Sequence, residues 1–353
     1  MNCKVQDKPG LIARNIRAKS EPLLDYLIEG TTKCNNRYQK AMSTKMYDVE
    51  ELVDYYFHRR LAAVVATMIS YLPVAITPNQ ITILGLGIGW SAALFLYDAE
   101  FHSPLNLESK TSLFVASLLI FSWIILDCVD GQVARLCGRG TRTGRILDGL
   151  ADSLVIIPNF YVMGQVMSSH YGGSYMPLAV VGGVSTWLHA AIYDKVKNVY
   201  MENASSQSEC NGETISSVHA EYLIAKEKNA YSLDSVLLGI YVVYMKMQAA
   251  VIHSASRASV KAASHGLLAS RDDQYRNWYR KQHGYIVRVA SLLGLSTHVV
   301  GLYVGYGAAV FDCNAIFYVQ LYVIFMNATA VYTLFLYTNS NMLQGPTFYQ
   351  KTL

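Results

Sequence analysis

Four aspartates stand in two pairs along one short part of the chain, and carboxylates arranged in this way are typical metal ligands. Asp127 and Asp130 are three positions apart, and Asp148 and Asp152 are four positions apart. Side chains at these spacings share one face of a helix, so each pair predicts two carboxylates on one helical surface. The short Gly-, Arg- and Thr-containing stretch between the pairs predicts an antiparallel hairpin on which all four carboxylates converge.

Four converging carboxylates repel one another, and at membrane depth they are costly unless a cation compensates. Oxygen ligands alone favour Mg²⁺ or Mn²⁺ over zinc or copper. Two such ions would clamp a pyrophosphate and stabilise charge on a leaving group. A loop of solvated acids is the alternative, and the coincidence with two apolar helix ends disfavours it. We therefore predict a site for divalent ions, two being expected, beside the small residues Gly131, Ala134, Gly144 and Gly149.

The composition indicates that these helices lie in a membrane. Hydrophobic residues make up 52% of the chain and charged residues only 15%, against about 25% charged residues in soluble domains. The apolar residues cluster into stretches near the length that crosses a hydrocarbon core of about 30 Å. We predict an all-α integral membrane protein with a six-helix transmembrane bundle. The expected spans are 80–97, 112–128, 146–168, 176–193, 285–309 and 313–337.

The placement of basic residues predicts the orientation. With the N-terminus inside, loops 98–111, 169–175 and 310–312 lie outside and carry Lys110 as their only Lys or Arg. This obeys the positive-inside rule and places the aspartates on the cytoplasmic side. The apolar stretch 235–252 contains Lys246, and a seventh span there would move the basic segment 253–284 outside. We therefore expect this stretch to be a re-entrant, interfacial or protein-packed helix.

These patterns divide the chain into four parts. Residues 1–46 are expected to form a cytoplasmic arm, and 47–76 to form interfacial or juxtamembrane helices that include an amphipathic helix over 47–60. Residues 77–338 form the transmembrane domain, with a cytoplasmic insertion over 194–284, and 339–353 form a tail. The insertion is expected to cap the site, select an acceptor, form a dimer contact or serve as a solvated connector. The six cysteines lack the spacing of a zinc site or a disulfide framework.

The acidic stretch resembles the signature of a known family. At every fixed position the sequence matches the motif of the CDP-alcohol phosphotransferases, which here reads Asp127-x2-Asp130-Gly131-x2-Ala134-Arg135-x8-Gly144-x3-Asp148-x3-Asp152. The resemblance extends to the six-helix plan and to the TPNQIT sequence over 77–82. Eight fixed residues at fixed spacing make this motif far more specific than a lone glycine-rich pattern.

The resemblance implies a reaction in which an alcohol hydroxyl attacks the phosphorus distal to the cytidine of a CDP-linked donor and CMP leaves. It implies that Asp127, Asp130 and Asp148 are metal ligands, with Asp127 also near the nucleotide. Asp152 would be the general base and a ligand of the second metal. It further implies a homodimer, a lipid substrate within the bilayer and no nucleic-acid partner. The CDP-binding residues would be Asp127, Gly131, Ala134, Arg135 and Gly144.

The substrates remain open at this level. One branch of the family transfers phosphatidyl from CDP-diacylglycerol to a polar alcohol, and the other transfers choline or ethanolamine phosphate to diacylglycerol or a similar lipid such as ceramide. The stretch 134–149 looks more like inositol-type members, which favours the first branch. Guanidinium groups pair well with phosphate, although they also suit anionic lipid head groups. The candidate acceptor- or phosphate-binding residues are Arg139, Arg142, Arg145 and Arg288.

Other functions are less consistent with this pattern. A transporter or channel would use buried acids as a cation path, but it would not need the Gly-Ala-Arg spacing between them. A catalytically inactive scaffold would not need the complete motif. His298, inside the fifth expected span, is expected to be a hydrogen-bonded packing residue. A bacterial plasma membrane and an endomembrane are both compatible with the sequence.

Overall fold

The structure is a computed structural model that describes residues 31–43, 46–74, 76–138, 142–205, 215–255 and 273–342. Within these ranges the protein is helical and contains no strand, which confirms the all-α prediction. The helices after the N-terminal segment are α3 (Pro78–Phe101), α4 (Ser109–Cys137), α5 (Arg142–Tyr171), α6 (Met176–Ala204), α7 (Ile215–Lys228), α8 (Leu233–Ala255), α9 (Asp273–Ala290), α10 (Leu295–Ala309) and α11 (Ala315–Asn339).

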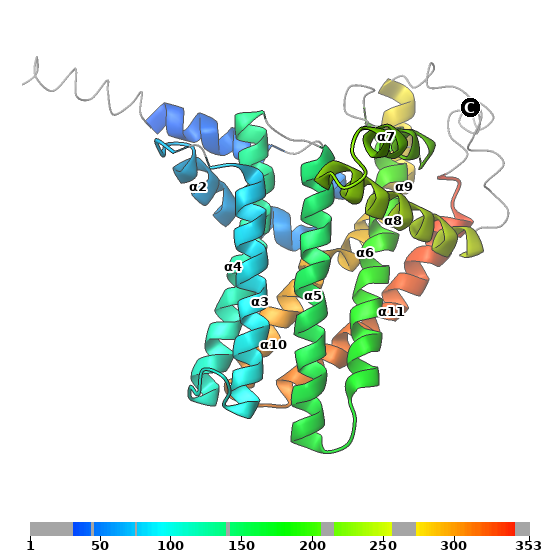
Figure 1. Cartoon of the computed structure of the whole chain (residues 1–353). Helices are drawn as coiled ribbons and strands as arrows, with labels where there is room; N and C mark the ends of the chain where they lie inside the picture. Colours follow the sequence, from blue (N-terminus) through cyan, green and yellow to red (C-terminus); the bar gives the residue numbers. More distant parts are fainter. Residues whose placement is uncertain are drawn as a thin grey trace, which may run out of the picture.

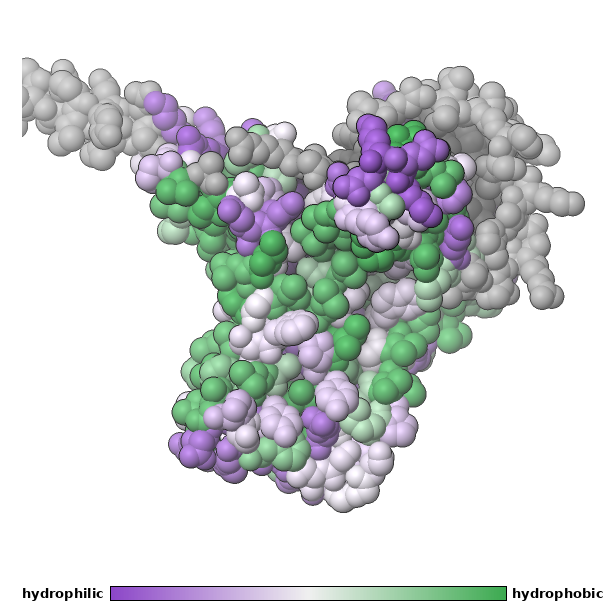
Figure 2. All heavy atoms as spheres, in the orientation of Figure 1, coloured by the Kyte–Doolittle hydropathy of each residue, from purple (hydrophilic) through white to green (hydrophobic). Residues whose placement is uncertain are grey.

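Six helical segments of the described chain are long and apolar enough to cross a membrane. They coincide with the six predicted spans and extend beyond them by up to 12 residues at one end, because the helices continue past their apolar cores. The six segments are Pro78–Phe101, Ser109–Cys137, Thr143–Tyr171, Met176–Ala204, Asp273–Ala309 and Ala315–Asn339. In Figure 2 hydrophobic residues cover much of the flank of this bundle, and hydrophilic residues gather at its two ends.

Helix α3 lies between the two helices that carry the acidic motif (Figure 1). The backbones of α4 and α5 hardly contact each other in the described residues, whereas both pack along α3. The prediction of a directly packed α4–α5 hairpin is therefore wrong. The physical reason is that small residues of α3 admit both neighbours: a Cβ added at Gly85 would meet Trp123 of α4, and one added at Gly89 would meet Val155 of α5.

The first turn of α3 is fixed by a capping box. Gln80 N donates to Thr77 Oγ1, and Thr77 N donates to Gln80 Oε1. Pro78 at the first helical position lacks an N–H that would otherwise be unpaired, so it suits this start. The sequence TPNQ thus sets where α3 begins, and this fixes the position of Thr82 along the helix axis about one turn later.

The fifth span is broken, which corrects the expected continuous helix over 285–309. Helix α9 ends at Ala290, a 3-10 turn covers Ser291–Leu293, and Gly294 has an extended backbone before α10 begins. A Cβ at Gly294 would lie 1.9 Å from Cδ of Glu51. The carboxylate of Glu51 occupies this space and accepts hydrogen bonds from the backbone N–H and the hydroxyl of Thr297, at 3.2 and 3.4 Å. It therefore satisfies a free N–H in the first turn of α10.

The N-terminal segment and the α7–α8 pair flank the same end of the bundle (Figure 1). The segment consists of a 3-10 turn over Tyr47–Val49, a π-helical turn over Asp54–His58 and α2 (Arg59–Ile69). Helix α2 is inclined to the long helices, and α8 crosses obliquely near the ends of α5 and α6. The positions of both relative to a bilayer, and the proposed domain limits, stay predictions.

The opposite end of the bundle contains a buried carboxylate with a structural role. Asp98, near the end of α3, is fully buried and accepts hydrogen bonds from the backbone N–H groups of the following loop at 2.8–3.1 Å, and from the hydroxyl of Ser112 at 2.8 Å. One side chain therefore pairs the amides of a loop that turns the chain from α3 into α4. The donating backbone groups belong to Leu105, Asn106 and Leu107.

We expect Asp98→Ala to loosen this loop without changing chemistry at the other end of the bundle. The substitution removes the shared acceptor of three backbone N–H groups, so the hydrogen bonds that hold the loop in its turn are lost. Hydrogen exchange of peptides covering 102–108 should become faster, and Asp98→Asn, which keeps one carbonyl oxygen, should give a smaller increase. Unchanged exchange in Asp98→Ala would contradict the role assigned to this carboxylate.

Candidate active site

The two aspartate pairs meet at one end of the bundle. Asp127 and Asp130 lie near the end of α4, whereas Asp148 and Asp152 lie near the start of α5. Carboxylate oxygens of Asp127, Asp148 and Asp152 all lie within 4.8 Å of one another. Asp148 also contacts Asp130, so the four side chains form one continuous cluster. The predicted convergence of the motif acids is present in the structure.

Asp130 is held by a side chain that the sequence reasoning did not identify. The hydroxyl of Thr82 on α3 donates to Asp130 Oδ2 at 2.5 Å, and both groups are buried. This contact orients Oδ2, one of the two carboxylate oxygens of Asp130. The sequence signal for it was the place of Thr82 as the last residue of the TPNQIT stretch over 77–82, to which the family resemblance extends.

The cluster is suited to divalent cations. Asp148 Oδ1 is buried and has no hydrogen-bond partner among the described side chains and backbone. An orphaned carboxylate oxygen beside other carboxylates is unfavourable unless a cation binds it. The donor set consists of carboxylate oxygens, which favours Mg²⁺ or Mn²⁺ over softer metals.

The N-terminal segment forms a further side of this site. Asp54 lies close enough to interact electrostatically with Asp127 and Asp152. Its carboxylate contacts Nδ1 of the buried His58 at 2.8 Å, and the other ring nitrogen of His58 lies 3.4 Å from the hydroxyl of Tyr303. The sequence reasoning treated this segment only as an interfacial helix and missed its contribution to the site.

Glu51 is the second acid that this segment brings toward the cluster. Burial and the nearby Asp54 carboxylate raise the pKa of Glu51 well above its usual range, while the Thr297 hydrogen bonds oppose that rise. Neighbouring Glu50 is ion-paired with Arg59 at 2.5 Å. The segment is therefore held both to α2 and to the start of α10.

The residues that the resemblance assigns to CDP binding occupy the same end of α4 and α5. Gly131 and Ala134 are half-buried on α4, and Gly144 lies in the first turn of α5. Arg135 donates to the backbone oxygen of Ala41 at 3.5 Å. Its Nη1 lies 3.7 Å from where a Cβ of Gly131 would stand, so its guanidinium flanks the small residues of the motif.

The four candidate acceptor-binding arginines are not gathered by the described structure. Arg139 lies outside the described residues, and Arg142 begins α5 without a described side chain. Arg145 is exposed on the first turns of α5. Arg288 on α9 donates to the backbone oxygens of Glu50 and Tyr47, and its guanidinium lies over the Tyr47 ring at 5.0 Å. Arg288 thus has partners in the N-terminal segment, and its role in acceptor binding stays a prediction.

His298 has the packing role that the sequence suggested. It is buried, and its Nε2 lies 3.2 Å from Nδ1 of His189, with the two rings stacked at 5.0 Å. The other ring nitrogen of His189 contacts Asn327 of α11 at 3.2 Å. These side chains therefore join α6, α10 and α11.

A comparison with known families agrees with the motif and the site geometry. A family model described as CDP-alcohol phosphatidyltransferase matches residues 75–255, which is just over half of the 353 residues. The chain belongs to the CDP-alcohol phosphatidyltransferase family. The match begins just before α3 and includes all four motif aspartates, so it covers the helices that form the acidic cluster.

Individual relatives within the CDP-alcohol phosphatidyltransferases match over a shorter stretch. Phosphatidylinositol phosphate synthases of Mycobacterium tuberculosis and Mycobacterium bovis are each 32% identical to this chain over 83 residues, which is 24% of this chain and 33% of the relative. The enzyme of that name from Mycobacterium marinum is 30% identical over 83 residues, or 31% of its length. The chain thus spans about a third of the length of these curated relatives.

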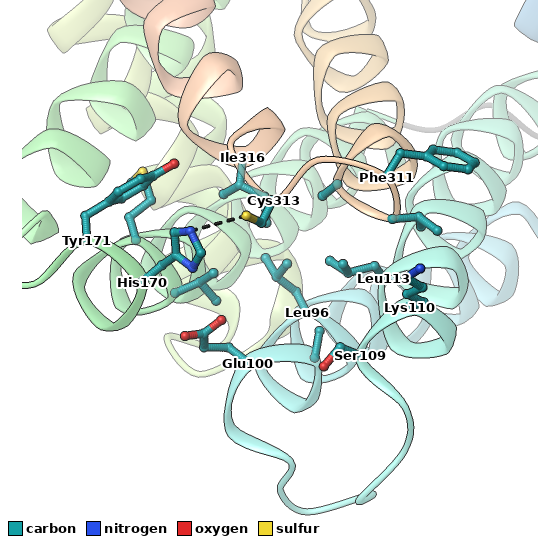
Figure 3. Close-up of a pocket in the computed structure, with 15 residues that line it drawn as sticks. Leu96, Glu100, Ser109, Lys110, Leu113, His170, Tyr171, Phe311, Cys313 and Ile316 are labelled. Carbon is teal, nitrogen blue, oxygen red and sulfur yellow. Dashed lines mark hydrogen bonds between the residues drawn. The ribbon is translucent and has the colours of Figure 1, made fainter.

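A pocket of about 350 Å³ lies at the end of the bundle away from the acidic cluster (Figure 3). Its wall is mainly apolar, and Glu100, Lys110 and His170 stand around it. His170 Nε2 lies 3.2 Å from the sulfur of Cys313. None of the motif residues of the CDP-alcohol phosphatidyltransferases lines this pocket, so it is separate from the acidic cluster.

We expect Thr82→Val to weaken metal binding in this member of the family. The substitution keeps the shape of the side chain but removes the hydrogen bond to Asp130. Loss of a group that orients a metal ligand commonly lowers metal affinity by about 10–100-fold. The Mn²⁺ concentration that gives half-maximal CMP release is therefore expected to rise by roughly this factor. Thr82→Ser keeps the hydroxyl and should restore the parent value. An unchanged Mn²⁺ requirement in Thr82→Val would refute the orienting role.

Proposed function

We propose that the protein is a metal-dependent enzyme that transfers phosphatidyl from CDP-diacylglycerol to a polar alcohol and releases CMP. The observation that carries this proposal is the meeting of Asp127, Asp148 and Asp152 within 4.8 Å at the ends of membrane helices. The orphaned oxygen of Asp148 supports a cationic partner in the cluster. Family membership supports the CDP-linked donor.

The four acids then divide into metal ligands and a general base. Asp127, Asp130 and Asp148 would hold Mg²⁺ or Mn²⁺, with Asp152 as a further ligand where a second ion binds. The bound ions would neutralise charge on the donor pyrophosphate. Asp152 accepts the proton of the acceptor hydroxyl, because an alcohol is a poor nucleophile until a positioned base takes that proton. Thr82 keeps Asp130 oriented, and Gly131, Ala134, Arg135 and Gly144 accommodate the CDP moiety.

The acceptor is an inositol- or glycerol-type alcohol in this proposal. The names of the mycobacterial relatives support an inositol-type substrate, and exposed Arg145 on α5 provides a cation near the cluster for an anionic acceptor. Transfer of choline or ethanolamine phosphate to diacylglycerol or ceramide is the second candidate. The active site would face the cytoplasm, where the basic loops of the sequence lie.

The deciding experiment measures CMP release and product lipids from the purified protein in bilayers. Reactions contain Mn²⁺ or Mg²⁺ and CDP-diacylglycerol with inositol, inositol phosphate, glycerol phosphate or serine, and parallel reactions contain CDP-choline or CDP-ethanolamine with diacylglycerol. CMP formation together with a new inositol- or glycerol-type phospholipid, abolished by EDTA, is the expected result. A choline or ethanolamine lipid instead would overturn the donor assignment, and no CMP from any pair would overturn the reaction class.

A further inference from the structure

Helix α8 has two apolar faces, and only one of them is covered by the described protein. Its inner face packs in a cluster with Val218 of α7 and Ile146 of α5, together with half-buried Tyr222. The buried residues that α8 contributes to this cluster are Leu237, Leu238 and Val242. Tyr244 of α8 also meets Trp187 of α6, with their rings 6.1 Å apart. The inner face is thus a protein contact.

The outer face of α8 carries a stripe of exposed large apolar side chains. Residues at successive spacings of three or four share one side of a helix. The stripe members and their exposed fractions are Leu233 (62%), Val236 (47%), Ile240 (42%), Val243 (56%) and Met247 (49%). Single exposed apolar residues need no explanation, but a contiguous stripe of this kind indicates a contact surface.

The position of α8 identifies the partner as lipid. The helix crosses obliquely near the ends of α5 and α6, where the long apolar helices emerge (Figure 1). Trp187, which α8 contacts, lies one turn from Val184, whose side chain is 52% exposed on a helix long and apolar enough to cross a membrane. Helix α8 therefore lies beside an exposed apolar surface of a candidate membrane span. Exposed Lys246 stands beside the stripe, and its long stem allows the ammonium group to reach the head groups.

Helix α2 supplies a second example of the same arrangement at this end of the bundle. Its inner face packs on α4 through Ala62 and Ala66, while Leu61, Val64 and Met68 are 41%, 43% and 64% exposed. Both helices are inclined to the bundle, and each has one protein-covered face and one exposed apolar face. An inclined helix with an exposed apolar face at this end of the bundle is suited to the interface of a membrane.

We propose that α8 lies within the interface of the leaflet on the aspartate side, with its outer stripe among acyl chains and its inner face bracing α5. The braced residues, Ile146, Leu147 and Leu150, alternate with Asp148 and Asp152 along the same two turns. Lipid contact thereby sets the position of the helical turns that carry two of the four acids. This last step rests on the proposed function, whereas the lipid contact itself does not.

The lipid contact is tested with Val243→Trp in the full-length protein, in bilayers of phosphatidylcholine with or without brominated acyl chains. The fluorescence of the introduced tryptophan is expected to fall in brominated bilayers and to resist quenching by iodide in the aqueous phase. Trp90 is 54% exposed on α3. The difference in fluorescence between the parent and Trp90→Phe gives the quenching of a tryptophan on a candidate span, for comparison. Lys246→Trp, at the edge of the stripe, should be quenched less by bromine and more by iodide.

Two outcomes would overturn the proposal. Quenching of the Val243→Trp emission by iodide and not by brominated lipid means that the stripe faces water. Quenching by neither means that protein, such as a second copy of the chain, covers it. Both readouts are independent of catalysis, so they decide the position of α8 even if no CMP is released in any assay.

The bracing step is tested by CMP release from the double variant Ile240→Asn and Val243→Asn. Reduced release at unchanged protein recovery is expected, and the conservative pair Ile240→Val and Val243→Ile should match the parent. Full activity of the asparagine pair, alongside lipid quenching at position 243, would refute the link between α8 and the catalytic turns while leaving the membrane contact in place.

Discussion

Asp152→Asn is expected to lower the rate of CMP release by about 10²–10⁴-fold, the usual contribution of a positioned general base. Asparagine has nearly the same shape but cannot accept the proton of the acceptor hydroxyl. Because the shape is kept, the loss should be chemical, at a carboxylate whose oxygen lies within 4.8 Å of those of Asp127 and Asp148. The measurement is single-turnover CMP formation at saturating donor and acceptor.

Measurements of metal binding distinguish the proposed general base from the proposed metal ligands. Asp148→Asn should weaken Mn²⁺ binding, measured by calorimetry, more than Asp152→Asn does, because Asp148 contacts both Asp127 and Asp130. Asp312→Asn, in the loop at the opposite end of the bundle, serves as the matched control and should leave both rate and binding unchanged. Normal turnover in Asp152→Asn would exclude its role as the base.

Gly89→Leu is expected to be the most damaging substitution on α3. A Cβ at this position would stand 2.5–3.1 Å from the side-chain carbons of Val155. Val155 is fully buried, and a β-branched residue in a helix has little rotamer freedom, so α3 and α5 must move apart. Overpacking of this kind costs about 1–3 kcal/mol. Because α3 also positions Asp130 through Thr82, a shift of about 1 Å is expected to reduce activity by roughly 10²-fold.

Gly87 provides the matched control two residues away on the same helix. It is exposed, and a Cβ there would meet nothing within 4 Å. Gly87→Leu should therefore leave thermal stability and CMP release near the parent values, whereas Gly89→Leu should reduce both. Equal behaviour of the two variants would show that α3 does not depend on close approach to α5.

The spacing of the acids and the clustering of apolar residues were sufficient to predict the meeting of the motif aspartates and the six candidate spans. Both are local properties, since carboxylates three or four positions apart share a helix face and the length of an apolar stretch is read directly from the sequence. The position of α3 between α4 and α5 depends on contacts between helices, so it could not be predicted from local sequence. Gly85 and Gly89 act through Trp123 and Val155, which lie on two other helices, and the hairpin interpretation therefore placed α4 and α5 in direct contact.

The remaining differences have the same origin in contacts between distant parts of the chain. The break at Gly294 depends on the carboxylate of Glu51, and the orientation of Asp130 depends on Thr82. Acceptor binding by Arg288 stays a prediction, and the contacts of its guanidinium with the backbone oxygens of Tyr47 and Glu50 were not foreseen. A basic side chain in a sequence shows its charge but not which backbone oxygens will reach it.

The contact between Glu51 and the start of α10 also orders events during synthesis of the chain. Glu51 and Thr297 are 246 positions apart, so at 5–20 residues per second the N-terminal segment waits roughly 10–50 s for its partner. Helices α4 and α5 are made within that interval. The N-terminal segment beside the acidic cluster therefore lacks its contact with the fifth span until α10 has been made.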